Sequence, residues 1–154
     1  MKKILVVVAH PDDEVLGCGG TIAKLIDQKC KVKVLFLSDG ESSRLKKVDA
    51  KKNLYRRVCA INAMKVLGVK DFSFNNFPDN EFDKISLLKI TKRIEIEIRK
   101  FNPDTILTHH NGDLNIDHQI TSKAVLTACR PKINNKVKLI LFFEILSSTE
   151  WNIP

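Results

Sequence analysis

The chain alternates short aliphatic runs with longer segments of helical periodicity, and no other feature limits its possible folds as much. Residues 2–9 (KKILVVVA) form a continuous aliphatic run, which is typical of a strand buried on both faces. Further strands are expected at 31–37, 72–74, 105–108 and 138–146. Helices are expected at 21–28, 51–67, 85–101 and 118–129. This alternation predicts an α/β fold: a doubly wound, mostly parallel five-stranded sheet of the Rossmann-like kind, with helices on both faces.

One of these segments supports two periodicities. Within 85–101, Ile94, Ile96 and Ile98 alternate with charged residues as they would in a strand, but apolar residues also recur at helical spacing. The length of the segment and its lack of turn residues favour a helix.

Gly68 directly follows the helical segment 51–67, at a position where glycine commonly ends a helix.

The fold class also predicts where a ligand would bind. In doubly wound sheets, ligands bind at the carboxyl ends of the strands, at the point where the strand order reverses. With the common order 3-2-1-4-5, which we assume from the fold class, that point lies between the first and fourth strands. The loops that follow these two strands hold the densest polar clusters of the sequence.

Length and composition favour one soluble domain. The 154 residues are 44% hydrophobic and 29% charged, which excludes a disordered or fibrous chain and predicts a single domain over 1–154. No apolar run approaches the ~18 residues of a membrane-spanning helix, and the run at 4–9 is too short for a signal peptide. We therefore expect a cytoplasmic protein. Its cysteines form no CxxC pair and are expected to be reduced thiols in or near the core: Cys18, Cys30, Cys59 and Cys129.

The formal net charge of +8 is compatible with several partners. Nucleic acid, anionic lipid and a phosphorylated substrate all attract a basic protein, but a lysine-rich solvated surface is the simpler explanation. Basic residues concentrate in one stretch: Arg44, Lys46, Lys47, Lys51, Lys52, Arg56 and Arg57. Only Tyr55 lies among them as a stacking aromatic, which argues against binding of single-stranded nucleic acid. We favour a surface near an anionic substrate.

The loop after the first strand has the composition of a metal site. His10, Asp12 and Asp13 follow the strand within a few positions, and an imidazole with carboxylates suits a hard or borderline divalent ion. Pro11 restricts the backbone between them. Two adjacent carboxylates point in different directions, so one can bind the ion while the other faces a water. The alternative is that an aspartate caps the next helix, but a cap explains only one of the carboxylates.

Three glycines follow this loop. Gly17, Gly19 and Gly20 could cradle a phosphate, but they match neither GxGxxG at the strand end nor a P-loop. A close approach between helix and sheet is the plainer explanation, with Cys18 packed among them.

The loop after the fourth strand (HHNGDLNIDH, 109–118) holds three of the four histidines. Its acidic spacing imitates an EF-hand, but His118 stands where the glycine belongs and Ala124 where the glutamate belongs. Instead, His118 is expected to complete a metal site with His10 and an aspartate. Asp117 would then cap the helix or orient an imidazole. His109 taken alone is expected to be a solvated loop residue.

Together, AHPDDE at 9–14 and HHNGDLNIDH at 109–118 resemble the PIG-L/LmbE-like zinc-dependent N-deacetylases. Enzymes of this family remove the acetyl group from N-acetylglucosamine-type sugars, including glycosylphosphatidylinositol, mycothiol and bacillithiol precursors and chitobiose. Weaker matches extend over nearly the whole chain, at 38–41, 56–68, 77–80 and 142–151.

The resemblance implies a role for particular residues. It implies that one zinc ion, or another divalent transition metal, is held by His10, Asp13 and His118, and that a zinc-bound water attacks the acetamide with Asp12 as general base. It further implies that Arg56 or Arg57, with Arg57 preferred, contacts the substrate and that Asp79 touches sugar hydroxyls. The oxyanion would be held by zinc with help from Asn115 or His110. Asp117 belongs to the same catalytic motif.

The sequence departs from the family pattern in three places. Asn115 stands where several relatives carry a histidine, and Val58 and Cys59 stand where relatives usually carry glutamates. Relatives are also longer, so the C-terminal part of the family domain is expected to be absent. A noncatalytic sugar- or nucleotide-binding module is therefore an alternative, as is a nucleic-acid binder.

A receiver-type phosphoacceptor domain is disfavoured. Such a domain needs an aspartate ending the third strand and a lysine ending the fifth, where this chain has Phe74-Asn75 and Ile145-Leu146. Stoichiometric zinc would separate the enzyme from the noncatalytic module.

Overall fold

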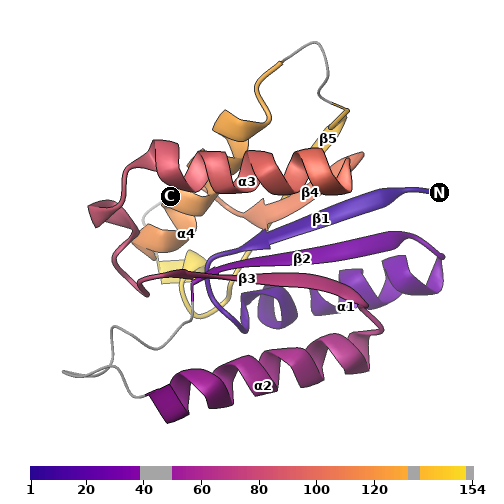
Figure 1. Ribbon diagram of the computed structural model, residues 1–154, viewed down its shortest axis with the longest axis horizontal. Helices are drawn as coiled ribbons and strands as arrows, with labels where there is room; N and C mark the ends of the chain where they lie inside the picture. The colour runs from indigo at the N-terminus through magenta and orange to yellow at the C-terminus, as the bar shows by residue number, and fades with distance from the viewer. Residues whose placement is uncertain (39–49, 132–135, 152–154) are drawn as a thin grey trace.

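A computed structural model, which describes residues 1–38, 50–131 and 136–151, shows a five-stranded sheet with the order β3-β2-β1-β4-β5 (Figure 1). All four strand pairs are parallel, so the expected fold class and the expected strand order are confirmed. The strands are β1 (Lys3–Val8), β2 (Lys31–Ser38), β3 (Asp71–Phe77), β4 (Thr105–His109) and β5 (Leu139–Phe143).

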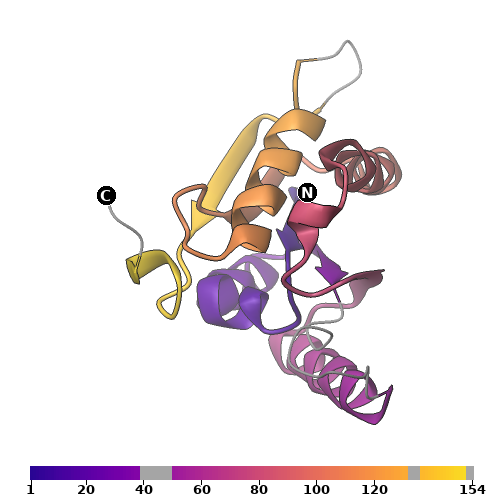
Figure 2. The ribbon, with the colours of Figure 1, turned by 90° about the vertical axis from the view of Figure 1, so that its left-hand side faces the viewer.

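Helices cover both faces of the sheet. They are α1 (Asp13–Asp27), α2 (Ala50–Leu67), α3 (Leu87–Phe101) and α4 (Ile116–Ala128), with short 3-10 turns η2 (Phe82–Lys84) and η3 (Thr149–Trp151). Viewed along the sheet, α1 and α2 lie on one side and α3 and α4 on the other (Figure 2). The helical alternative for 85–101 is thereby confirmed.

The continuous aliphatic run of β1 is explained by these two layers. Successive strand residues point to opposite faces. Val6 and Val8 belong to the core beneath α1 and α2, whereas Leu5 and Val7 belong to the core beneath α3 and α4. Because both faces of β1 are buried, an apolar side chain is favoured at each of these positions of the strand.

The first helix differs from the expectation, because it begins at Asp13 rather than at residue 21. The glycine-rich segment is helical, and its backbone leaves helical geometry only at Cys18 (φ −144°, ψ 19°). A Cβ on Gly17 would collide with the side chain of Phe143 and lie 2.8 Å from Ile145 Cδ1, so close approach is the reason for this glycine. It is not the reason for Gly20, which has nothing within 4 Å of a Cβ position.

Other boundaries shift by smaller amounts. The fourth helix begins at Ile116, two residues before His118, because the Asn115 side chain accepts a hydrogen bond from Asp117 N at 2.9 Å and so caps the helix. Gly68 has φ +76°, as expected for a glycine that ends a helix. The third strand extends to Phe77, into a segment expected to be a loop.

The fifth strand is shorter than expected and only partly covered. It ends at Phe143, and the exposed apolar residues on it are Leu139, Leu141 and Phe142. Cys18 is buried and Cys30 and Cys129 are half-buried, but Cys59 is exposed, contrary to the expectation for it. Among the described residues, no helix has the length and apolar character needed to cross a bilayer.

Part of the expected basic surface cannot be placed. Arg44, Lys46 and Lys47, and most of the family match at 38–41, lie outside the described residues.

Candidate metal centre

The two polar loops meet because β1 and β4 are neighbours in the sheet. Their residues pair in parallel, with Val6 opposite Leu107, so both strands end at the same edge. His10 and Asp13 follow β1 at that edge, and His118 lies in the first turn of α4, which follows β4. The expected convergence of the two motifs is therefore present in the structure.

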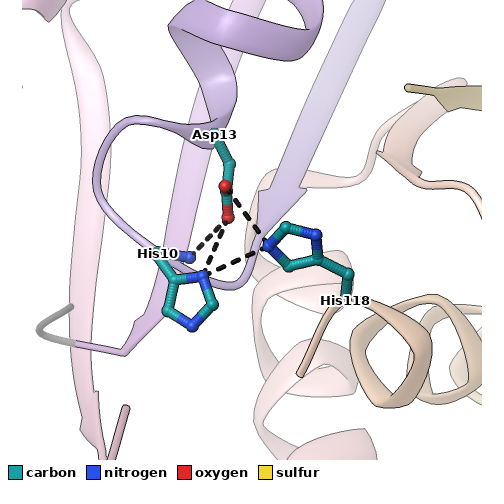
Figure 3. A group of neighbouring side chains, drawn as sticks. All are labelled: His10, Asp13 and His118. Carbon is teal, nitrogen blue, oxygen red and sulfur yellow. Dashed lines mark hydrogen bonds and ion pairs between the residues drawn. The ribbon is translucent and has the colours of Figure 1, made fainter. Parts of the chain in front are cut away.

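The metal-ligating groups of three side chains, two imidazole nitrogens and one carboxylate, face one another in a triangle (Figure 3). His118 Nε2 lies 3.3 Å from His10 Nδ1 and 3.3 Å from Asp13 Oδ1, and His10 Nδ1 lies 3.4 Å from Asp13 Oδ2. Ligands about 2.0–2.1 Å from a tetrahedral ion stand roughly 3.3–3.4 Å apart. The two imidazole nitrogens and the carboxylate could thus hold a divalent metal ion, and all three side chains are buried.

Carboxylates fix the orientation of the His10 ring. His10 Nε2 lies 3.1 Å from Asp117 Oδ2 and 3.1 Å from Asp79 Oδ1, so this nitrogen carries a proton that both acids can accept. That leaves the Nδ1 lone pair directed at the triangle. Asp117 is in turn held by the backbone N–H groups of Asn80 (2.7 Å) and Phe82 (3.0 Å). Asp117 therefore orients an imidazole, one of the two roles expected for it, while Asn115 caps the helix.

A second carboxylate does the same for His118. Asp113 Oδ2 lies 3.1 Å from His118 Nδ1, which leaves Nε2 free to face the triangle. The hydroxyls of Ser148 (3.0 Å) and Thr149 (2.6 Å) donate to the same carboxylate oxygen. The segment after β5 is thereby tied to the loop after β4.

The charges around His10 suit a cation. Burial by itself lowers the pKa of His10, but hydrogen bonds to Asp117 and Asp13 and the charge of Asp79 raise it to about 10. Burial alone would raise the pKa of Asp13, yet the neighbouring imidazoles of His109, His10 and His118 hold it well below its usual range. In the metal-free protein a proton on His10 supplies the positive charge that this group of buried carboxylates requires.

His118 follows the same pattern. Burial lowers its pKa, and the contacts with Asp13 and Asp113 raise it above the usual value. Burial would raise the pKa of Asp113, but hydrogen bonds from Thr149 and Asn115 N and the contact with His118 lower it.

Asp12 lies at the rim of the same site, with its side chain 47% exposed. Its Oδ2 is 3.2 Å from Arg56 Nη1, and its backbone N–H donates to Glu14 Oε2 at 3.0 Å. Its backbone has φ 151°, a conformation that L-residues rarely adopt. Asp12 and Asp13 consequently point in different directions, as expected for adjacent acids with different tasks.

A cavity of about 190 Å³ opens over the triangle. The residues lining it are His10, Asp12, Asp13, Leu16, Arg56, Asp79, Asn80, Asn115, His118, Ile145, Ser147 and Ser148. The structure thus gathers most of the expected site residues around one opening.

Two expected site residues lie elsewhere. Arg57 packs its guanidinium over the ring of Phe74, 4.7 Å from the centroid, and it is the neighbouring Arg56 that lines the cavity. His110 is exposed, accepts a hydrogen bond from Gly112 N at 3.1 Å, and meets Phe142 edge-on. Neither side chain is among those lining the cavity.

Two further residues of the site are buried, contrary to or beyond what the sequence predicts. His109 was expected to be solvated, but it is fully buried and stacks on His118 with ring centroids 3.9 Å apart. Glu14 is also fully buried, beneath Asp12. A signal for His109 was present in the sequence: it comes directly after the apolar run 105–108, and it is the last residue of β4, at the edge where the two strands end.

The chain is similar to a known protein family and to several of its members. The family model described as GlcNAc-PI de-N-acetylase, PIG-L, matches residues 5–129. The chain is 31% identical over 138 residues to the uncharacterized deacetylase YaiS of Escherichia coli, covering 84% of this chain and 69% of that protein. It is 31% identical over 135 residues to a probable N-acetyl-alpha-D-glucosaminyl L-malate deacetylase 2 of Bacillus cereus, covering 82% of this chain and 60% of that protein.

A solved structure with a different activity is also similar. The 4-carboxy-2-hydroxymuconate hydratase GalB of Pseudomonas putida KT2440 is 28% identical, with a TM-score of 0.73, covering 90% of this chain and 60% of that one. The chain therefore spans about 60–69% of the length of these relatives. The matched region includes both polar loops with all three residues of the triangle, and the chain belongs to the PIG-L family of GlcNAc-PI de-N-acetylase.

Proposed function

We propose that this protein is a metal-dependent hydrolase that removes the N-acetyl group from an N-acetylglucosamine-type sugar or glycoconjugate. The observation that carries the proposal is the triangle of His10 Nδ1, the Asp13 carboxylate and His118 Nε2, whose mutual contacts are 3.3–3.4 Å through one or the other carboxylate oxygen, beneath a cavity whose rim holds Asp12. Relatives that are named deacetylases, one of them for an N-acetylglucosaminyl malate, support the reaction class.

In this proposal His10, Asp13 and His118 hold one zinc ion, or another divalent transition metal, through their three facing atoms. When bound, such an ion supplies Lewis-acid polarisation of the acetamide carbonyl and lowers the pKa of water to ~7. The protein's contribution is to keep both imidazoles in the tautomer that faces the ion, through Asp117 and Asp79 on one ring and Asp113 on the other.

Asp12 is the general base. Its carboxylate is the exposed acid beside the triangle, so it can take a proton from the attacking water and return it to the leaving amine nitrogen. The Arg56 guanidinium 3.2 Å away favours the ionised carboxylate, the form in which Asp12 must start. In the overall reaction, an amide and a water molecule are converted to a free amine and acetate.

The cavity wall supports assignments for substrate contacts. Asn115 lines the cavity and its amide N–H can donate to the oxyanion, which favours Asn115 over His110 for this task. Arg56, rather than Arg57, is positioned to meet a substrate. Asp79 and Asn80 line the same cavity, where sugar hydroxyls would find acceptors and donors.

The test is elemental analysis of the purified protein followed by assay of amine release from N-acetylglucosamine conjugates. Asp12→Asn is expected to keep roughly one zinc per chain and to lose at least about a hundredfold in kcat, since general bases contribute about 10²–10⁴. His118→Ala is expected to lose both zinc and turnover.

Matched controls lie next to these residues. His110→Ala removes an exposed histidine outside the cavity and is expected to leave zinc content and turnover unchanged. Full activity of Asp12→Asn would refute the assignment of the base. A wild-type protein that binds no zinc would instead favour a noncatalytic sugar- or nucleotide-binding module.

The similarity to GalB supports a second candidate, the addition of water to a carbon–carbon double bond. The same cavity, metal ligands and base would serve both reactions, because each activates a water. Loss of ultraviolet absorbance from 4-carboxy-2-hydroxymuconate, without amine release from any N-acetyl sugar, would favour the hydratase.

A further inference from the structure

We infer that His109 is a positioning residue of the proposed metal centre: it accepts a hydrogen bond from Ala9 and stacks on His118, and so fixes the two loops that carry the metal ligands relative to each other. The inference rests on the proposed function, because it concerns how the metal site is held. His109 itself is not part of the triangle that faces the cavity.

The contacts of His109 reach every ligand-bearing segment. Its Nε2 accepts the Ala9 N–H at 3.0 Å, and Ala9 directly precedes His10. Its ring stacks on the ring of His118 with centroids 3.9 Å apart and planes inclined by 12°. The same Nε2 lies 3.3 Å from Asp13 Oδ2. One side chain therefore contacts the strand end before His10, the carboxylate of Asp13 and the imidazole of His118.

The hydrogen bond assigns the tautomer of the ring. A neutral imidazole has one nitrogen that donates and one that accepts. The Ala9 N–H is the nearer partner of Nε2, at 3.0 Å against 3.3 Å for Asp13 Oδ2, so Nε2 is assigned as the acceptor. The proton then belongs on Nδ1, which is buried with no hydrogen-bond partner among the described residues. With its lone pair engaged by Ala9, Nε2 would not be available as a metal ligand, so the ring acts by holding its neighbours in place.

Burial makes this arrangement rigid. His109 is fully buried and also packs against Phe143 of the neighbouring strand, with ring centroids 4.9 Å apart. His110, one residue later, is exposed and contacts none of the three ligands in the described structure. The two consecutive histidines thus have different tasks, because successive residues at the end of a strand point in opposite directions.

Two substitutions separate the two contacts of the ring. His109→Phe keeps a planar ring for stacking but removes the acceptor for Ala9 N–H. His109→Gln offers a carbonyl acceptor but removes the ring. Thr108→Val is the control, because Thr108 is equally buried on the same strand and its hydroxyl has no partner among the described residues.

The measurement is zinc affinity by competition with a chromogenic chelator, with circular dichroism of each metal-free variant to confirm folding. His109→Phe is expected to bind zinc about 10–100-fold more weakly than the wild type, as substitutions of groups that orient metal ligands commonly do. The zinc affinity of His109→Gln is expected to lie between those of His109→Phe and the wild type. The zinc affinity of Thr108→Val is expected to match that of the wild type within about twofold. Zinc affinity of His109→Phe equal to that of Thr108→Val would overturn the inference.

A measurement on the wild-type protein keeps the inference testable if a variant does not fold. A long-range ¹H–¹⁵N spectrum should show His109 protonated at Nδ1 and unprotonated at Nε2; the opposite tautomer would refute the Ala9 contact. Failure of the proposed function looks different, because the wild-type chain itself would then bind no zinc.

Discussion

Glu14 is a buried residue that holds the backbone of the candidate site in place. It is fully buried, and its Oε2 accepts the backbone N–H of Asp12, the proposed base, at 3.0 Å. Its other oxygen has no hydrogen-bond partner among the described side chains and backbone groups. Burial, reinforced by the charges of Asp13 and Asp12 and offset in part by backbone hydrogen bonds, raises the pKa of Glu14 to about 8.

This pKa predicts a pH dependence of stability. The folded protein holds a proton on Glu14 that the unfolded chain releases near pH 4.5, so the contribution is full below pH 4.5 and is lost as pH rises through about 8. The unfolding free energy of metal-free wild type is expected to fall between pH 5 and pH 8. In Glu14→Gln the fall should be smaller by at least about 1.4 kcal/mol, the equivalent of one pKa unit.

Urea unfolding of both proteins at the two pH values measures this difference. The comparison isolates Glu14, because His10, whose pKa is raised to about 10, contributes equally to both. An identical pH dependence in the two proteins would show that Glu14 is ionised in the folded state.

The two adjacent arginines provide a second prediction at the scale of residues. Arg56→Gln is expected to lower kcat/KM by about tenfold or more, because it removes a charged hydrogen-bond donor from the cavity wall beside Asp12. Arg57→Gln is the matched control and should change kcat/KM by less than about threefold, since Arg57 packs on Phe74. Steady-state amine release measures both, and a larger loss in Arg57→Gln would contradict the proposed substrate contact.

At the scale of elements, the position of α1 depends on one glycine. Gly17 lies where the helix meets Phe143 and Ile145, and these side chains leave no room for a Cβ. Gly20 is in the same helix, but nothing lies within 4 Å of the place its Cβ would take. Substituting each glycine by alanine therefore separates the effect of close packing, at Gly17, from the effect of helix propensity, at Gly20.

Gly17→Ala is expected to destabilise the fold by about 1–3 kcal/mol, because α1 or the end of β5 must shift to admit the methyl group. Gly20→Ala is expected to stabilise it by about 0.5–1 kcal/mol, since alanine loses less conformational freedom in a helix. Urea unfolding of metal-free protein gives both values. Equal effects at the two positions would mean that the helix does not need this close approach.

At the scale of the whole molecule, the site joins segments from across the sheet. Its residues come from the loop after β1 and the start of α1, from α2, from the connection between β3 and α3, from the loop and helix after β4, and from the segment after β5. Figure 1 shows that β3 and β5 are the two outer strands, so the site is assembled from the full width of the sheet. A bound ion would therefore stabilise the molecule as a whole.

Zinc is accordingly expected to raise the melting temperature of the wild type. A free concentration of 100 times Kd adds about 2.7 kcal/mol, which corresponds to roughly 5–10 °C for a chain of this length. His118→Ala should show a shift of no more than about 2 °C, because its ligand set is incomplete. Differential scanning fluorimetry with and without zinc checks this, and an equal shift in the variant would place the ion elsewhere.

The fold class, and the sheet edge at which the two polar loops meet, could be predicted from the sequence alone. The alternation of aliphatic runs with helical periodicity required a parallel sheet, and the two polar loops had to meet if the first and fourth strands were neighbours. The helix over 13–20 was missed because its glycines imitate a turn, whereas tertiary packing against Phe143 explains Gly17.

Adjacent candidates of the same chemistry could be told apart only from the folded structure. His109 is buried and His110 exposed because neighbouring residues at a strand end face opposite ways. Arg56 reaches the cavity and Arg57 does not because consecutive helix residues point about 100° apart. The residue types along the chain indicate which chemistry a site can perform. The direction of each side chain depends instead on strand register and helix phase, which are fixed by packing across the whole sheet.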